Sequence, residues 1–177
     1  MTLPLSISSN SPKATQRLGM HLGQMAEPGD VFLLNGTLGA GKTHLAQGIA
    51  WGLGVGEYAR SPTFVIINLY HGRLKVYHID LFRLQDSEEA SDFGIEEYLN
   101  GDGVCVVEWA DNFPNLFSEN SLWINLDYTN VSRERHITIN LDEHTRPQIS
   151  KTLAQLFRKQ QTRPDGHLRI PRNSVGR

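Results

Sequence analysis

The chain has 177 residues, of which 39% are hydrophobic and 20% charged, a composition typical of one globular domain with an apolar core. Its single cysteine excludes an intramolecular disulfide and a cluster of thiolate metal ligands. No apolar run approaches the roughly 18 residues of a membrane span, and residues 1–10 carry no basic side chain, so we expect a soluble, cytoplasmic protein with no membrane contact.

The net charge of −2 conceals an uneven distribution along the chain. Residues 146–177 hold 8 of the 17 Lys and Arg residues and only one of the 19 acidic residues, which gives this segment a charge of +7. Such a segment can bind nucleic acid through its phosphates, but residues 162–177 also have the composition of a disordered terminus. We predict one domain over residues 1–160 and a basic, flexible tail over residues 161–177.

The N-terminal third alternates between helix and strand signals. Ser11-Pro12 is typical of a helix start, and apolar residues then recur at helical spacing until Pro28-Gly29, which predicts a helix over 12–26. The short apolar run 31–34 predicts a strand buried on both faces. A second helix is predicted from Lys42 to the glycines that follow Trp51.

The rest of the chain shows further strand and helix patterns. Strands are predicted at 64–70, 74–79, 104–107, 122–127 and 136–141, and helices at 83–99 and 147–160. His71-Gly72-Arg73 joins the first two of these strands as a hairpin, and the last two strands form another. The sequence therefore predicts an α/β fold with a mixed sheet, whose parallel core is flanked by helices and extended by antiparallel hairpins.

Residues 36–43, Gly-Thr-Leu-Gly-Ala-Gly-Lys-Thr, match the Walker A pattern of a phosphate-binding P-loop. The glycines let backbone N–H groups turn inward around the phosphates, and the helix N-terminus adds its partial positive charge. Lys42 is expected to reach the β- and γ-phosphates and the Thr43 hydroxyl to bind Mg²⁺, so ATP and Mg²⁺ are the expected cofactors. The predicted phosphate-binding residues are Gly36, Thr37, Leu38, Gly39, Ala40, Gly41, Lys42 and Thr43.

Two acidic residues follow predicted strands and are candidates for the metal and the attacking water. Glu108 ends the apolar run 104–107, and Asp80 ends the run 74–79. A hard cation prefers carboxylate oxygen, but the spacing does not distinguish which of the two binds it. Thr63, in the loop before a strand, is either a switch-like sensor of the γ-phosphate or part of a proline turn, and Trp109 is a candidate lid over the nucleotide.

Several separated segments together resemble the TsaE family, also called YjeE, over about residues 11–141. The segments are Pro28-Gly29-Asp30, the P-loop, Ser61-Pro62-Thr63-Phe64, His78-Ile79-Asp80-Leu81-Phe82-Arg83-Leu84, Gly94-Ile95-Glu96-Glu97 and Val107-Glu108-Trp109. Jointly they are highly specific, whereas the P-loop alone is not. The family usually has tyrosine at the position of Phe82, so any role of that hydroxyl is absent here.

The resemblance implies a P-loop NTPase that serves the synthesis of threonylcarbamoyladenosine beside the tRNA anticodon, together with the partners TsaB and TsaD. It further implies that Asp80 belongs to the metal site with Thr43 and Glu108, and that Glu108 serves hydrolysis with Lys42. Thr63 would lie in a switch-like loop and Trp109 near the nucleotide. ATP hydrolysis would reset the TsaB–TsaD assembly. Apart from the resemblance, we expect hydrolysis to be slow without partners, and the charge of the basic tail makes contact with tRNA a further hypothesis.

Two other classes of function stay open on the residues alone. A P-loop kinase would need an acceptor pocket and usually an arginine-rich lid, and the chain shows no arginine-rich lid segment. A nucleotide-gated binding module would not need a water-activating acid such as Glu108. A GTPase is disfavoured because no lysine follows an asparagine, as the Asn-Lys-x-Asp guanine motif would require.

Overall fold

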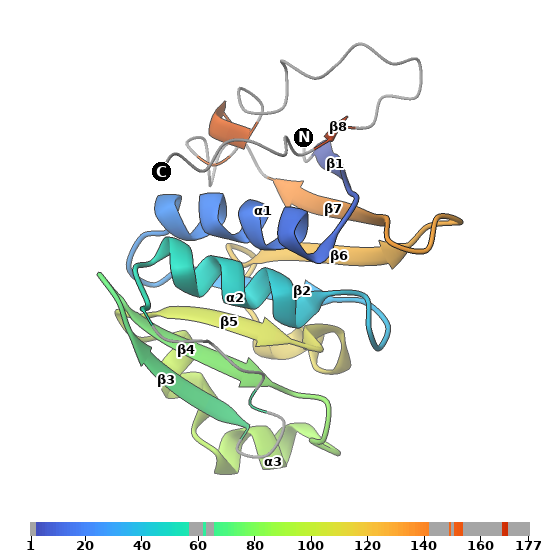
Figure 1. Cartoon of the computed structure of the whole chain (residues 1–177). Coiled ribbons are helices and arrows are strands. Elements are labelled where there is room, and N and C mark those ends of the chain that lie inside the picture. Colours follow the sequence, from blue (N-terminus) through green and yellow to red (C-terminus); the bar gives the residue numbers. More distant parts are fainter. Residues whose placement is uncertain are drawn as a thin grey trace.

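The computed structural model describes residues 3–56, 62, 66–141, 149, 151–153 and 168–169. In this part of the chain, eight strands form one sheet in the order β3-β4-β5-β2-β6-β7-β1-β8 (Figure 1). The strands are β1 (Leu3–Ser9), β2 (Val31–Asn35), β3 (Ile67–His71), β4 (Lys75–Asp80), β5 (Val104–Glu108), β6 (Leu122–Tyr128), β7 (Arg135–Leu141) and β8 (Leu168–Arg169). The helices are α1 (Pro12–Met25), α2 (Lys42–Gly52), α3 (Ser87–Asp92) and α4 (Ile95–Leu99), with the 3₁₀ turns η1 (Ala110–Asn112) and η2 (Pro114–Leu116).

The centre of the sheet is parallel and its flanks are antiparallel. Strands β4, β5, β2 and β6 run parallel to one another. Strand β3 adds antiparallel to β4, and β7 and β1 continue antiparallel beyond β6. The predicted mixed α/β sheet is thus confirmed. Because parallel strands end at the same edge, the segments that follow β2, β4 and β5 meet there.

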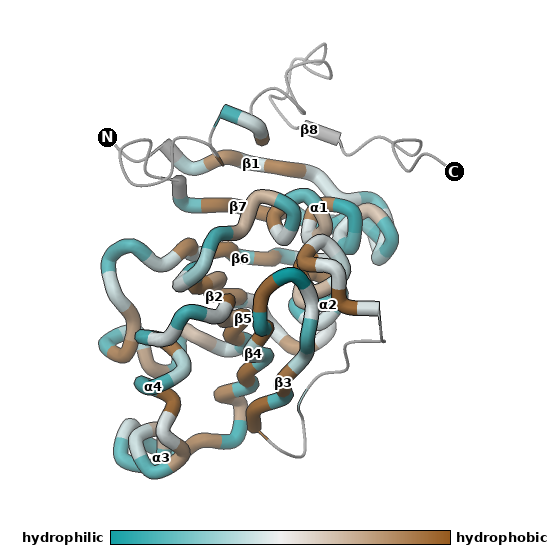
Figure 2. Tube along the Cα trace, turned by 90° about the vertical axis from the view of Figure 1, so that its left-hand side faces the viewer, coloured by the Kyte–Doolittle hydropathy of each residue, from teal (hydrophilic) through white to brown (hydrophobic). Residues whose placement is uncertain are grey.

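Two apolar layers cover the two faces of the sheet. In β2, Phe32 and Leu34 point into the layer shared with α1 and α2, while Leu33 points into the layer shared with α3, α4 and η1. Figure 2 shows α1 and α2 on one side of the strands and α3 and α4 on the other, with hydrophobic residues concentrated along the strands. Continuous apolar runs such as 31–34 and 104–107 suit strands that are buried on both faces.

Helices α1 and α2 lie side by side on one face and approach each other through glycines (Figure 1). A Cβ atom on Gly48 of α2 would lie 2.1 Å from the carbonyl oxygen of Gln16, and one on Gly23 of α1 would lie 2.1 Å from that of Ile49. Only residues without a side chain allow this separation. The packing anchors α2, and with it the P-loop at its N-terminus, against the rest of the layer.

Most predicted elements lie within a few residues of the observed ones, but one prediction was wrong and one strand was not predicted. The single helix expected over 83–99 is two short helices, because Gly94 adopts a left-handed φ of 64° between them. Strand β1 was not predicted, since its sequence Leu-Pro-Leu-Ser-Ile-Ser-Ser lacks an apolar run. Strand β3 begins at Ile67, three residues after the start of the run expected for it.

The C-terminal predictions fall largely outside the described residues. Residues 149 and 151–153 are helical, as expected of the helix over 147–160. Within the segment 161–177 only Leu168–Arg169 is described, as a short strand parallel to β1. In the described ranges, no helix is both long enough and apolar enough to cross a membrane.

Candidate functional site

The segment that joins β2 to α2 has the backbone of a phosphate-binding loop. Gly36, Gly39 and Gly41 have φ values of 136°, 78° and 110°, a region that side-chain-bearing residues rarely occupy. Gly41 is also the residue immediately before α2, so the loop ends at a helix N-terminus with its partial positive charge. The loop and helix start form the kind of backbone that holds anionic oxygens.

Lys42 is the first residue of α2, and its side chain reaches back into this loop; the residue is 4% exposed. Its Nζ donates to the carbonyl oxygens of Gly36, at 2.5 Å, and Thr37, at 3.1 Å. The same atom lies 3.6 Å from the centroid of the Trp109 ring, a cation–π contact. Burial lowers the pKa of Lys42 below its ordinary value of 10.5, and the nearby carboxylates of Glu108, Asp111 and Asp80 oppose this shift. A bound anion would likewise favour the charged form.

The two candidate carboxylates are brought together by the strand register. Asp80 ends β4, Glu108 ends β5, and these two residues are Cα partners in the parallel ladder. Their side chains therefore leave the same face of the sheet, toward α2. Both are buried, with exposures of 8% and 3%.

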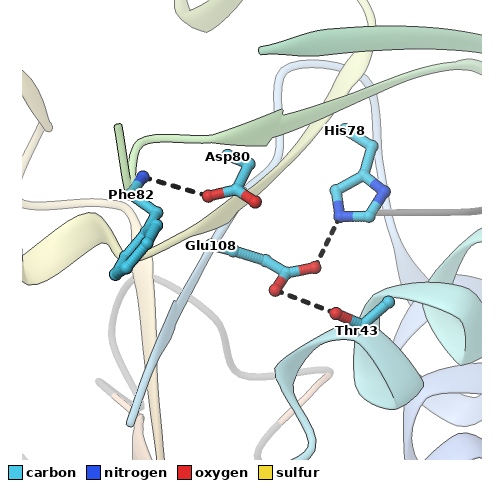
Figure 3. A network of polar contacts seen from close by, with 5 residues as sticks. All are labelled: Thr43, His78, Asp80, Phe82 and Glu108. Atoms are coloured by element: carbon cyan, nitrogen blue, oxygen red, sulfur yellow. Dashed lines mark hydrogen bonds and ion pairs between the residues drawn. The ribbon is translucent and has the colours of Figure 1, made fainter. Parts of the chain in front are cut away.

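Glu108 connects the P-loop helix to the sheet (Figure 3). Its Oε2 accepts a hydrogen bond of 3.1 Å from the Thr43 hydroxyl, and its Oε1 lies 2.8 Å from Nε2 of His78. Because an ionised carboxylate only accepts, His78 Nε2 is the donor when Glu108 is ionised. His78 is 2% exposed and holds one carboxylate oxygen of Glu108, while Thr43 of α2 holds the other.

Asp80 and two aromatic rings complete the rim of the site. Asp80 Oδ1 accepts from the backbone N–H of Phe82 at 3.0 Å, which orients the carboxylate. The Phe82 ring is 54% exposed and lies with its centroid 4.7 Å from that of Trp109. Trp109 has a left-handed φ of 60°, uncommon for a residue with a side chain, and this turn directs its ring over Lys42.

These groups line one cavity of about 310 Å³. Its walls come from the P-loop, the start of α2, and the ends of β4 and β5. The lining residues are Leu38, Gly39, Gly41, Lys42, Thr43, His44, Asp80, Phe82, Glu108 and Trp109. Of the residues predicted as a site, the structure thus gathers the loop, both carboxylates and the tryptophan, whereas Thr63 lies outside the described residues.

The oxygen donors in this cavity fit a hard divalent cation that also binds phosphate. Thr43 offers a hydroxyl and Asp80 and Glu108 offer carboxylates, all within one cavity. Mg²⁺ usually keeps several waters and takes only one or two carboxylates, with phosphate oxygens completing its shell.

A second and larger cavity, of about 570 Å³, lies on the other side of the P-loop. The start of α1 and the hairpin between β6 and β7 enclose it with the loop. Its lining residues are Asn10, Ser11, Pro12, Thr15, Gly39, Ala40, Gly41, His44, Ser132, Arg133 and Arg135. Gly39, Gly41 and His44 line both cavities, so the P-loop is the partition between them.

A family profile described as "Threonylcarbamoyl adenosine biosynthesis protein TsaE" matches residues 9–137, well over half of the chain and the whole of this site. The chain belongs to the TsaE family. The match includes every described residue of the P-loop cavity. The resemblance drawn from separated motifs is therefore confirmed over nearly the range expected for it.

Individual TsaE proteins support the same assignment. A protein of Treponema pallidum named tRNA threonylcarbamoyladenosine biosynthesis protein TsaE is 42% identical over 118 residues, which are 67% of this chain and 87% of that protein. Its namesake from Bacillus subtilis is 46% identical over 101 residues, 56% of this chain and 63% of that protein. The crystal structure of Bacillus subtilis YdiB has a TM-score of 0.72 at 32% identity, covering 88% of this chain and 97% of that chain.

The TsaE motifs identify the residues of the smaller cavity but not the hairpin residues that contact the P-loop from its other side. Sequence reasoning singled out His78 only as a histidine near Asp80, and the structure shows that it holds Glu108. Tyr128 and Arg135, which contact the P-loop from the β6–β7 hairpin, were not expected at all. No local motif marks them, because their partners lie 90 and 95 residues away in the chain.

Proposed function

We propose that this TsaE-family chain is an ATPase subunit required for the threonylcarbamoyl modification of adenosine beside the tRNA anticodon. In this proposal it binds ATP with Mg²⁺, hydrolyses ATP slowly when alone, and uses hydrolysis to reset an assembly of TsaB-like and TsaD-like proteins. The names of its relatives support the pathway, since they are called tRNA threonylcarbamoyladenosine biosynthesis proteins.

The observation that carries the proposal is the link between the P-loop and a buried carboxylate. Glu108 accepts from Thr43, the residue that the P-loop pattern assigns to Mg²⁺, and is held from behind by His78. A module that only bound nucleotide would not need an acid fixed in this place. A carboxylate held by two partners can orient a water and take its proton.

Each part of the site has its own role in the proposed reaction. The loop N–H groups and the α2 N-terminus would hold the phosphates, and Lys42 would turn from its present carbonyl partners to the β- and γ-phosphate oxygens. Thr43 and Asp80 would hold Mg²⁺ and its waters, and Glu108 would polarise the attacking water. Mg²⁺ offsets the negative charge that develops during phosphoryl transfer.

The nucleoside is proposed to occupy the larger cavity. The smaller cavity contains the carboxylates and suits the metal and γ-phosphate, so the base and ribose would extend to the opposite side of the loop. A volume of about 570 Å³ lies within the usual range of small-molecule sites. Polar side chains such as Asn10 and Ser132 offer hydrogen-bonding groups to a base or ribose.

The experiment is tRNA modification by the purified full chain with its TsaB-like and TsaD-like partners. Lys42→Ala should reduce ATP hydrolysis by about hundredfold or more, because the main charge on the phosphates is lost. The variant should stop after no more than a single modified tRNA per assembly, whereas wild type continues. Lys75→Ala, which removes an exposed lysine at the start of β4, is the matched control and should behave as wild type.

Two results would contradict the proposal. Full multi-turnover modification by Lys42→Ala would show that ATP hydrolysis by this chain is not required. Transfer of the labelled γ-phosphate to a small molecule or to a nucleic-acid end, instead of its release as inorganic phosphate, would identify a kinase.

A further inference from the structure

The hairpin between β6 and β7 contacts the outer side of the P-loop. Tyr128, the last residue of β6, donates its hydroxyl to the carbonyl oxygen of Leu38 at 2.8 Å. Arg135, the first residue of β7, donates Nε to the carbonyl oxygen of Ala40 at 3.2 Å and Nη2 to that of Gly39 at 3.4 Å. Three consecutive carbonyls of the loop therefore accept from two side chains of a distant hairpin.

The two side chains also hold each other in place. Tyr128 and Arg135 are Cα partners in the β6–β7 ladder, and the guanidinium carbon lies 4.2 Å from the centroid of the tyrosine ring. Arg135 Nη1 donates further to the carbonyl oxygens of Ser132 and Glu134, at 3.1 and 2.9 Å. Contacts within the hairpin therefore hold the guanidinium in place independently of the loop. This lowers the conformational entropy that is lost when the guanidinium binds the loop.

The hairpin contacts the glycine-containing backbone of the P-loop. A P-loop presents its N–H groups to phosphate only if the carbonyl groups point outward, and the glycines that permit this backbone also make it flexible. Gly39 is fitted to the hairpin, since a Cβ atom there would lie 2.6 Å from the Tyr128 hydroxyl. The hairpin binds three such carbonyl groups, those of Leu38, Gly39 and Ala40.

We propose that Tyr128 and Arg135, here called the hairpin clamp, are positioning residues that preorganise the P-loop for phosphate. The assignment rests on the proposed function in that the loop is taken to bind a nucleotide. Neither residue lines the smaller cavity that holds Lys42 and the carboxylates, whereas Arg135 also lines the larger cavity proposed for the nucleoside. For Arg135, positioning is therefore tested by the exchange rates of the nucleotide-free chain together with the ADP affinity. Their effect is to keep residues 38–40 in the binding conformation, so that the nucleotide does not have to order them.

Two measurements on the full-length chain test the hairpin clamp. The first is hydrogen exchange of the Ala40 amide without nucleotide, because this amide donates to Thr37 O at 3.1 Å inside the loop. Tyr128→Phe and Arg135→Gln should each speed its exchange, while amides of β2 stay unchanged. The second is ADP affinity by calorimetry with Mg²⁺, which each variant should weaken about two- to tenfold.

The design separates geometry from charge and from general loss of stability. Arg135→Lys keeps the positive charge but loses the planar fork, so it should resemble Arg135→Gln. Val131→Thr changes an exposed residue of the same hairpin, 59% exposed, and should match wild type in both measurements. Unfolding temperatures of Tyr128→Phe and Val131→Thr should stay close to that of wild type, because these side chains are 52% and 59% exposed.

Three outcomes would overturn the hairpin clamp. They are wild-type Ala40 exchange in the double variant that combines Tyr128→Phe with Arg135→Gln, wild-type ADP affinity in that variant, or full recovery by Arg135→Lys, which would reduce Arg135 to a charge effect. A wild-type chain that binds no ADP would contradict the proposed function instead, and the exchange rates of the nucleotide-free chains would then decide on the hairpin clamp by themselves.

Discussion

Replacing Glu108 by glutamine and by alanine separates its chemical role from its structural one. The side chain is 3% exposed and is hydrogen-bonded to both Thr43 and His78. Glutamine keeps the shape, an acceptor for His78 and a hydrogen-bonding group for Thr43, but cannot take a proton from water. Alanine removes the proton acceptor and leaves both neighbours without this partner.

The expected magnitudes follow from these contacts. Loss of a general base should lower kcat by about 10² to 10⁴ in both variants. ADP affinity should remain near wild type, because binding depends on the loop backbone and Lys42. The alanine variant should also lose about 1–3 kcal/mol of stability, the cost of a buried polar group such as His78 without its partner. For a chain of this size each kcal/mol corresponds to about 2–4 °C in Tm, which predicts a loss of roughly 2–12 °C.

The assays are phosphate release at saturating ATP and Mg²⁺, calorimetric titration with ADP, and thermal unfolding without nucleotide. Glu88→Gln is the matched control, since it neutralises an exposed carboxylate on α3. Turnover of Glu108→Gln within about threefold of wild type would refute the role of Glu108 as a base. Equal losses of affinity and turnover would instead indicate a metal-binding or folding role.

Two further predictions concern the core. Gly48→Ala should destabilise the chain by about 1–3 kcal/mol in denaturant unfolding, because the new Cβ atom would lie 2.1 Å from the carbonyl oxygen of Gln16. Gly56→Ala is the control and should be close to neutral, because no atom lies within 4 Å of the new Cβ atom. Equal stability of the two variants would refute the packing argument. Burial raises the pKa of the Cys105 thiol to about 12, so at pH 8 an aromatic disulfide reagent should modify it only when the chain unfolds; stoichiometric reaction of the native chain within seconds would contradict this.

The sequence predicted those elements that are marked by a helix cap or by a continuous apolar run. The helix expected over 12–26 is observed as Pro12–Met25, because the Ser11 side chain caps it by accepting from Ala14 N, as its sequence position suggests. The buried strands β2 and β5 were evident from continuous apolar runs. Strand β1 was missed because pairing with β7, and not its own composition, defines it.

The site shows the same division. A phosphate loop is contiguous in sequence, and its glycines, lysine and threonine have meaning only in that order, so residues 36–43 predicted it without a structure. Asp80 and Glu108 could each be placed at a strand end, but their pairing depends on β4 lying beside β5 in register. That register results from the packing of the whole sheet and has no local code.

The sequence by itself determined that this chain carries a P-loop, which strands precede the candidate acids, and which family it resembles. The tertiary structure decided which side chains meet: His78 behind Glu108, Trp109 over Lys42, and the hairpin clamp against the outer side of the loop. The physical reason is that backbone conformation is encoded by neighbours in the chain. Contacts between residues as distant as Leu38 and Tyr128 depend instead on strand order, which the burial of both sheet faces selects.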